Sequence, residues 1–142
     1  MAKAYFNNDG NVVKISTDSD ASNLNLNVDN HTVENISDSD FNSLRQRSKI
    51  VSLSGDSVTF EDASVTYDNQ DQLSDYLNNN LIPIMDQFLQ NNESNGMYDA
   101  INNYKNICKN TDLSTITYPL NSSWEKYCED NSITYYHPLQ IP

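Results

Sequence analysis

The chain has 142 residues, of which 20 are acidic and 8 basic, giving a formal net charge of -12. That length is sufficient for one ordinary domain with a hydrophobic core. The acidic balance argues against binding to nucleic acid or to an anionic membrane, because both surfaces are themselves negative. The three glycines build neither a P-loop nor a dinucleotide-binding fingerprint, which excludes the two standard classes of nucleotide enzyme.

The composition is polar, with a mean hydropathy of -0.70, so disorder has to be weighed against folding. Nine Tyr, four Phe and one Trp are spread along the chain, and aromatic side chains supply large buried areas. They favour a single folded domain over residues 1–142 with long polar loops. No apolar run has the length of a transmembrane segment or the form of a signal peptide, and we expect neither.

The first part of the chain, to about residue 67, is predicted to be rich in strands. Apolar runs on either side of Asp9-Gly10 predict a β-hairpin over residues 4–15. Leu and Val alternate with Asn over 24–28, which predicts a lone or edge strand. Residues 64–67 predict one more strand, because β-branched and aromatic residues alternate there.

The strongest strand signal is a second hairpin over residues 50–60. It predicts that Val51 and Leu53 share one face with Val58 and Phe60 of the partner strand.

From residue 71 to 130 the apolar spacing becomes helical. An amphipathic helix is predicted over 71–91, with a kink or break near Ile82 because Pro83 lacks a backbone N–H. A second helix is predicted over 97–109. A third, short helix is predicted to begin at a Ser122 or Ser123 cap and to end at residues 130–131.

Residues 133–142 predict an extended tail that packs on the domain, because the segment is rich in aromatic and β-branched residues. Strands followed by helices indicate an α+β fold, with N-terminal antiparallel hairpins, two or three helices and the extended C-terminal segment.

Two Asp-Ser-Asp segments, ending at Asp20 and Asp40, resemble the start of a calcium loop. The rest of an EF-hand is missing, because Asn23 stands where glycine is required and Lys49 falls at the last ligand position. We expect Asp18 and Asp38 to serve as turn or helix-capping residues, and no metal or other cofactor to be bound.

Arg45, Arg47 and Lys49 form the one basic cluster, and in a strand they would project from one face. Contact with nucleic acid is one interpretation. A net charge of -12 favours another, in which Arg45 and Arg47 bind an acidic group of the same chain or of another subunit.

The few residues with reactive side chains have no catalytic pattern around them. His31 and His137 have no local partner that would mark a base or a metal ligand. Cys108 and Cys128 lie on apolar helical stripes, where free cysteine packs as a small hydrophobe, and a reducing compartment is expected. No catalytic residue is predicted.

Trp124, Tyr135 and Tyr136 are the aromatic candidates for a protein interface, because aromatic side chains supply large contact areas at low entropic cost. Core packing is the favoured alternative for Trp124.

The opening Met1-Ala2-Lys3-Ala4-Tyr5-Phe6, the Asp-Gly hairpin after it and the Asn-, Asp-, Ser- and Tyr-rich composition resemble small proteins of low-GC marine tailed phages, cyanophages especially. The resemblance implies a virion or virion-assembly component that acts through contacts with proteins. It also implies a location in the virion or the host cytoplasm.

The first functional hypothesis is therefore a phage structural or assembly accessory protein, which forms a homo-oligomer and contacts other virion components. Unpaired strand edges support this hypothesis, because they need charged guards such as Lys14 or a strand from a neighbouring subunit. The alternative is an acidic regulatory or inhibitory protein, such as a DNA mimic or an immunity-type protein, that binds a basic host protein. An enzyme is the least favoured class, because no spacing brings an acid, a base and a nucleophile together.

Overall fold

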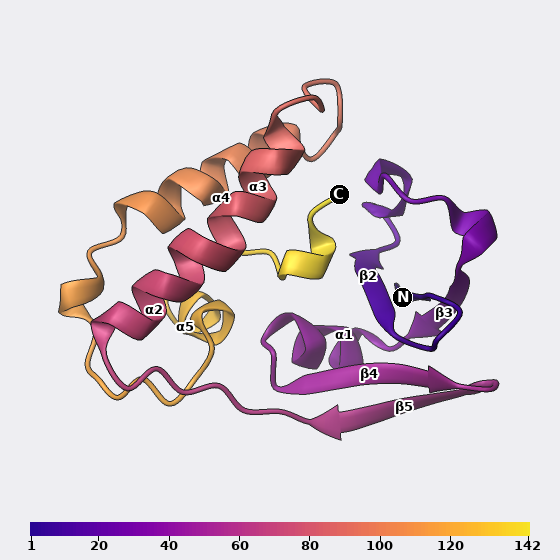
Figure 1. Cartoon of the computed structure of the whole chain (residues 1–142), viewed down its shortest axis with the longest axis horizontal. Coiled ribbons are helices and arrows are strands. Elements are labelled where there is room, and N and C mark those ends of the chain that lie inside the picture. Colours follow the sequence, from indigo (N-terminus) through magenta and orange to yellow (C-terminus); the bar gives the residue numbers. More distant parts are fainter.

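The computed structural model of the chain describes residues 1–142, apart from the side chain of Val28. Antiparallel strands fill the N-terminal half and helices the C-terminal half, as Figure 1 shows, so the predicted α+β fold is confirmed.

Two antiparallel sheets form the N-terminal half. The first has the strand order β2-β1-β3, with β1 (Ala2–Phe6), β2 (Val12–Thr17) and β3 (Thr32–Ile36). The second is a hairpin of β4 (Lys49–Ser54) and β5 (Ser57–Asp62). Both predicted hairpins are confirmed, and in the second Val51 lies opposite Phe60 and Leu53 opposite Val58.

The two sheets meet at Gly10. The Leu53 N–H donates to the Gly10 carbonyl at 2.9 Å, and Asn11 forms an isolated bridge with Ser52. Gly10 has a φ of 82°, and a Cβ added to it would stand 2.0 Å from the Leu53 carbonyl oxygen. Glycine is required here because any side chain would push β4 away from the β1–β2 turn.

Two predicted strands are wrong. Residues 24–27 have no regular structure and lie between 3₁₀ turns at Ala21–Asn23 and Val28–Asn30. The Asn27 side chain accepts from the Asp29 N–H at 3.1 Å, which favours a turn over a strand. In the segment 64–67, only Tyr67 pairs, through an isolated bridge to Leu120.

One helix within the strand-rich half was not predicted. Helix α1 (Asp38–Arg45) is capped by Ser37, whose hydroxyl accepts from the Asp40 N–H, and it buries Phe41 and Leu44. Asp38 and Asp40 therefore occupy its first turn, where carboxylates are favoured by the helix dipole.

The helices of the C-terminal half follow the predicted stripes: α2 (Gln70–Tyr76), α3 (Ile82–Leu89), α4 (Tyr98–Asn110) and α5 (Trp124–Asp130). A π-helical turn, Leu77–Leu81, separates α2 from α3. It lies directly before Pro83, so the predicted break near Ile82 is confirmed.

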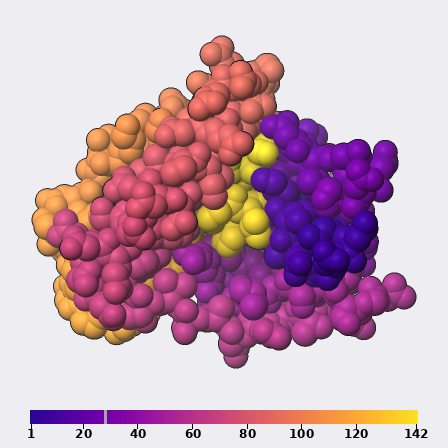
Figure 2. All heavy atoms as spheres, viewed as in Figure 1, coloured from indigo at the N-terminus to yellow at the C-terminus, as the bar shows by residue number. Residues whose placement is uncertain are grey.

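Two groups of buried side chains make the core, one among the helices and one around the sheets. The C-terminal segment lies between them, as Figures 1 and 2 show. Its Tyr135 and Ile141 belong to the helical group, and Leu139 packs against the sheet group. The tail is extended apart from a 3₁₀ turn, Pro138–Gln140, and it packs as predicted.

Candidate functional site

The most unusual polar cluster of the molecule lies where the α1–β4 turn meets the helices. Glu125, in the first turn of α5, is 0% exposed. The Tyr76 hydroxyl, from the end of α2, donates to Glu125 Oε1 at 2.6 Å. Arg47 Nη1 lies 3.5 Å from the same oxygen, and the guanidinium carbon lies 4.6 Å from the centre of the Tyr76 ring. A buried carboxylate is thus held by one tyrosine and one arginine.

The turn that supplies Arg47 differs from the predicted strand. Arg45 ends α1, Arg47 has a φ of 58° in the turn, and Lys49 begins β4. The prediction that these three side chains project from one strand face is therefore wrong. Ser37 caps a helix that continues to Arg45, so Arg45 is helical and does not belong to an alternating strand pattern with Arg47 and Lys49. The favoured interpretation, an acidic group of the same chain or of another subunit, holds for Arg47, which contacts Glu125, and is wrong for Arg45, which donates to the Tyr135 carbonyl and to Gln140.

Burial perturbs every titratable group of this cluster. It raises the pKa of Glu125, against the opposing effects of the Arg47 charge and the Tyr76 hydrogen bond. The pKa of Tyr76 is raised by burial and by the Glu125 charge, and that of Tyr67 is raised to about 12 for the same reasons. Burial opposes the Arg47 charge, but the pKa of Arg47 is raised because the Glu125 carboxylate beside it favours the cation. The Arg47 charge and the Tyr76 hydrogen bond favour the ionised Glu125 carboxylate, and burial opposes it.

The cluster is also incompletely satisfied. Arg47 Nη1, Glu125 Oε2 and the Tyr67 hydroxyl are buried without a hydrogen-bond partner within the described chain. Since buried polar atoms without partners are rare in folded proteins, such a group is where functional strain is expected. The carboxylate itself is closed off, so an external molecule reaches it only if Arg47 or Tyr76 moves.

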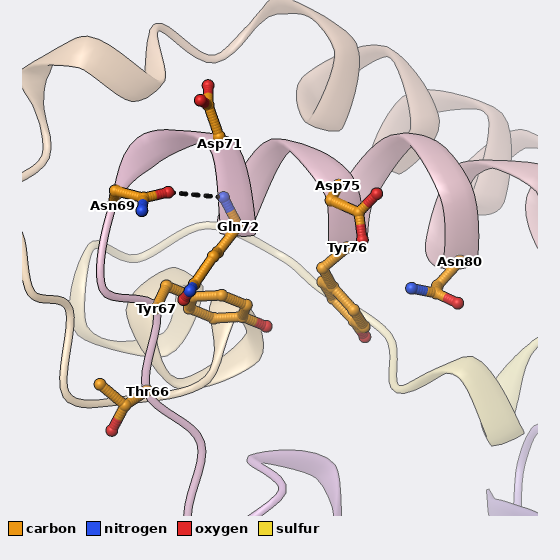
Figure 3. Close-up of a pocket in the computed structure, with 8 residues that line it drawn as sticks. All are labelled: Thr66, Tyr67, Asn69, Asp71, Gln72, Asp75, Tyr76 and Asn80. Carbon is orange, nitrogen blue, oxygen red and sulfur yellow. Dashed lines mark hydrogen bonds between the residues drawn. The ribbon is translucent and has the colours of Figure 1, made fainter.

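A shallow surface cavity of about 550 Å³ lies beside the cluster. Tyr67 and Tyr76 line it together with Asp71, Asp75 and Asn80. Figure 3 shows both rings on the same side of α2, with Asp75 and Asn80 next to Tyr76. The ring centres are 6.1 Å apart. Aromatic rings beside exposed carboxylates suit a cationic side chain better than an anionic one.

Arg45 holds the C-terminal segment. It donates from Nη2 to the Tyr135 carbonyl at 2.8 Å and from Nε to Gln140 Oε1 at 3.1 Å. Its guanidinium carbon lies 4.3 Å from the centre of the Tyr135 ring. Lys14, predicted as a strand guard, likewise donates to the Ile141 carbonyl at 2.5 Å. Both basic side chains therefore bind the tail.

His137 caps the last 3₁₀ turn. Its Nδ1 accepts from the Leu139 N–H at 3.0 Å, and burial with the nearby charges of Arg47 and Arg45 lowers its pKa to about 3. The ring is therefore neutral at physiological pH and has a structural contact that the sequence did not predict.

The structure places the aromatic candidates mostly inside the protein. Trp124 is 0% exposed and donates from Nε1 to the Tyr104 hydroxyl at 3.0 Å, so it occupies the core, as the alternative interpretation had it. Tyr135 is buried as well. Tyr136 is partly exposed, with its ring centre 6.0 Å from that of Tyr104. Of the three, Tyr136 alone offers surface to a partner in this fold.

Sequence reasoning missed Glu125, Tyr76 and Tyr67 as a group. A signal was present, because Glu125 lies three residues before Cys128 and therefore on the buried face of α5. Nothing local pointed to Arg47 as its partner.

Acidic side chains outnumber basic ones among the charged residues of the surface. Six of the eight basic side chains contact groups of the same chain: Lys3, Lys14, Arg45, Arg47, Lys105 and Lys126. By contrast, Asp71 and Asp75 of α2 and Asp68, just before the helix, are exposed, and no ion pair with a basic group is found for them among the described residues.

The remaining candidates are placed as follows. Cys108 and Cys128 are free and buried, and burial raises the pKa of the Cys108 thiol to about 12. Asp18 is bound by Lys3 at 2.8 Å and by the Met1 amine at 3.0 Å. In the part of the chain that the structure describes, no group of three or more acidic, histidine or cysteine side chains has the arrangement of a metal site. Within the same residues, every helix is too short or too polar to cross a bilayer.

Comparison with protein-family models, with curated proteins and with solved structures found no match.

Proposed function

We propose that this protein acts by binding other proteins and not by catalysis, as a structural or assembly accessory protein of a phage virion. One observation carries the proposal: basic side chains are mostly held by contacts within the chain, whereas most carboxylates face solvent unpaired. A surface of one sign attracts a partner of the opposite sign and accelerates its association. The partner is therefore a protein with a basic surface.

The resemblance to small phage proteins supports the virion assignment, and the acidic face of α2 supports the basic partner. The same face favours a second candidate, an acidic regulator that binds a basic host protein. The two functions differ in where the partner resides and share the chemistry of the contact.

Affinity capture with the full chain tests the proposal. The protein is immobilised, exposed at low salt to lysate of infected host cells, and eluted with high salt before the eluate is identified by mass spectrometry. We expect a basic protein that is released by salt, because screening weakens contacts between exposed charges. Acidic proteins, nucleic acid or an empty eluate would overturn the proposal.

Purified particles then separate the two candidates. If the captured protein and this chain are both found in the particles, the accessory function is supported. If the captured protein is a host protein and particles lack the chain, the regulatory function replaces it.

A further inference from the structure

The second sheet has one occupied edge and one open edge. On the inner side, β4 is joined to the β1–β2 turn through the bond from the Leu53 N–H to the Gly10 carbonyl. On the outer side, no strand pairs with β5 in the described part of the chain. Figure 1 shows β5 along the outer boundary of the molecule. A row of backbone donors and acceptors therefore faces solvent along Ser57–Asp62.

The open edge has the residues of a strand that accepts a neighbour. Its centre is Val58-Thr59-Phe60, which favours β structure and contains no proline. Val58 and Phe60 are half-buried on the inner face, whereas Thr59 and Glu61 are exposed on the outer face. A hairpin of two strands gains stability when a third strand is added.

The charges near the open edge of β5 indicate which kind of strand can pair with it. The edge is flanked by exposed Asp56, Glu61 and Asp62 and has no basic residue of its own. An antiparallel pairing of two copies centred on Thr59 would put Asp56 of one chain opposite Asp62 of the other. Like charges directly opposite each other in a sheet are destabilising, so a second copy is the less suitable occupant.

We propose that the outer edge of β5 receives an extended segment of a partner protein in which basic and apolar residues alternate. The apolar side chains continue the face formed by Val58 and Phe60, and the basic side chains lie on the face of Glu61. Backbone hydrogen bonds supply affinity, and the Glu61 carboxylate, on the same face as the basic side chains, supplies specificity. This inference rests on the proposed function and adds to the α2 face a second contact with the partner, at the outer edge of β5.

Amide hydrogen exchange of the full chain tests this proposal directly. The probe is a synthetic peptide of alternating valine and lysine, and the control peptide has the same sequence with its backbone N-methylated at the valines, whose N–H groups would face β5 in antiparallel pairing. We expect the probe, at about ten times its dissociation constant, to slow exchange in Ser57–Asp62 about tenfold. The control peptide carries the same charge, but it cannot complete the backbone ladder and should leave this segment unchanged.

A variant with Glu61→Lys keeps the strand and reverses the charge on that face, so it should lose the protection. Equal effects of both peptides, or protection confined to α2, would overturn strand addition and leave the proposed function standing. Protection of β5 that rises with protein concentration in the absence of peptide would show a second copy as the occupant and would also overturn it. Failure of the proposed function would instead appear in the capture experiment, as the absence of any basic partner.

Discussion

The buried pair of Arg47 and Glu125 gives the sharpest test of the structure. Substitution of Arg47 by Met removes the charge that lies 3.5 Å from a carboxylate with no solvent exposure. Breaking a buried ion pair by removing one partner costs roughly 3–5 kcal/mol. The Arg47 side chain is 29% exposed, so water replaces part of the contact and the lower end, about 3 kcal/mol, is expected. For a chain of this length that loss lowers Tm by about 10 °C.

The loss should depend on pH in a defined direction. Burial raises the pKa of Glu125, so protonation of Glu125 stabilises the folded state. This contribution to stability is complete below the pKa of Glu125 in the unfolded chain and is lost as the pH rises through its pKa in the folded chain. Without Arg47, the main group that offsets that loss at neutral pH is gone, and the hydrogen bond from Tyr76 is left. The Arg47→Met variant should therefore be strongly destabilised at pH 7 and much less so at pH 4.

Denaturant unfolding followed by fluorescence measures this effect, because Trp124 is the one tryptophan of the chain and is fully buried. Lys126→Met is the matched control: it removes an exposed pair with Asp130 and should cost less than about 1 kcal/mol. Adding Glu125→Gln to Arg47→Met should recover most of the stability at pH 7. Equal destabilisation at pH 4 and pH 7, or no recovery in the double variant, would refute the assignment of a charged buried pair.

Three other substitutions test separate parts of the fold. His137 has a folded pKa of about 3, so its contribution to stability is present above pH 6.5 and is lost as the pH falls. Between pH 7 and pH 4.5 the free energy of unfolding should therefore fall by roughly 2 kcal/mol more in the wild type than in the His137→Asn variant. Urea unfolding at each pH measures this difference. Gly10→Ala should cost about 3 kcal/mol or more in the same assay, because the new methyl group meets the Leu53 carbonyl oxygen; an unchanged unfolding midpoint would contradict the contact between the sheets. Trp124→Ala should cost about 3–5 kcal/mol through the cavity and the lost bond to Tyr104, and a loss below 1 kcal/mol, followed by circular dichroism, would place this residue outside the core.

The elements predicted correctly from the sequence are those in which a periodic apolar pattern ends at turn or capping residues. The hairpin over 50–60 has alternation on both strands and a Gly-Asp turn, and the face shared by Val51, Leu53, Val58 and Phe60 was predicted correctly. The helix over 71–91 has a continuous stripe, and Pro83 marks its irregular turn. In both, the local signal and the tertiary packing agree.

The failures occur where Ser, Asp and Asn dominate. Residues 24–28 alternate as a strand does, but Asn side chains bind nearby backbone and make turns there. Strand β3 and helix α1 follow directly, and each has few apolar residues. Strand β3 is stabilised by its pairing with β1, and helix α1 by its capping serine, Ser37. Neither feature produces a periodic apolar pattern in the sequence.

The candidate site was the least predictable feature. Arg47, Tyr76 and Glu125 come from three elements far apart in the sequence, and only the packing of the helices on the α1–β4 turn brings them together. The preference of Arg47 for an internal acidic partner followed from the charge balance. The identity of that partner did not, because a single glutamate in a short helix has the same local pattern whether buried or exposed.

The claim that an unpaired acidic face binds a basic protein is tested most directly by repeating the capture with variant proteins. Substitution of Asp68, Asp71 and Asp75 by Asn removes the charge of the α2 face, and substitution of the exposed Asp9, Asp29 and Asp99 by Asn is the matched control with the same change in net charge. The account predicts that the control retains the basic partner and that the α2 variant releases it. Equal capture by both variants would contradict the account.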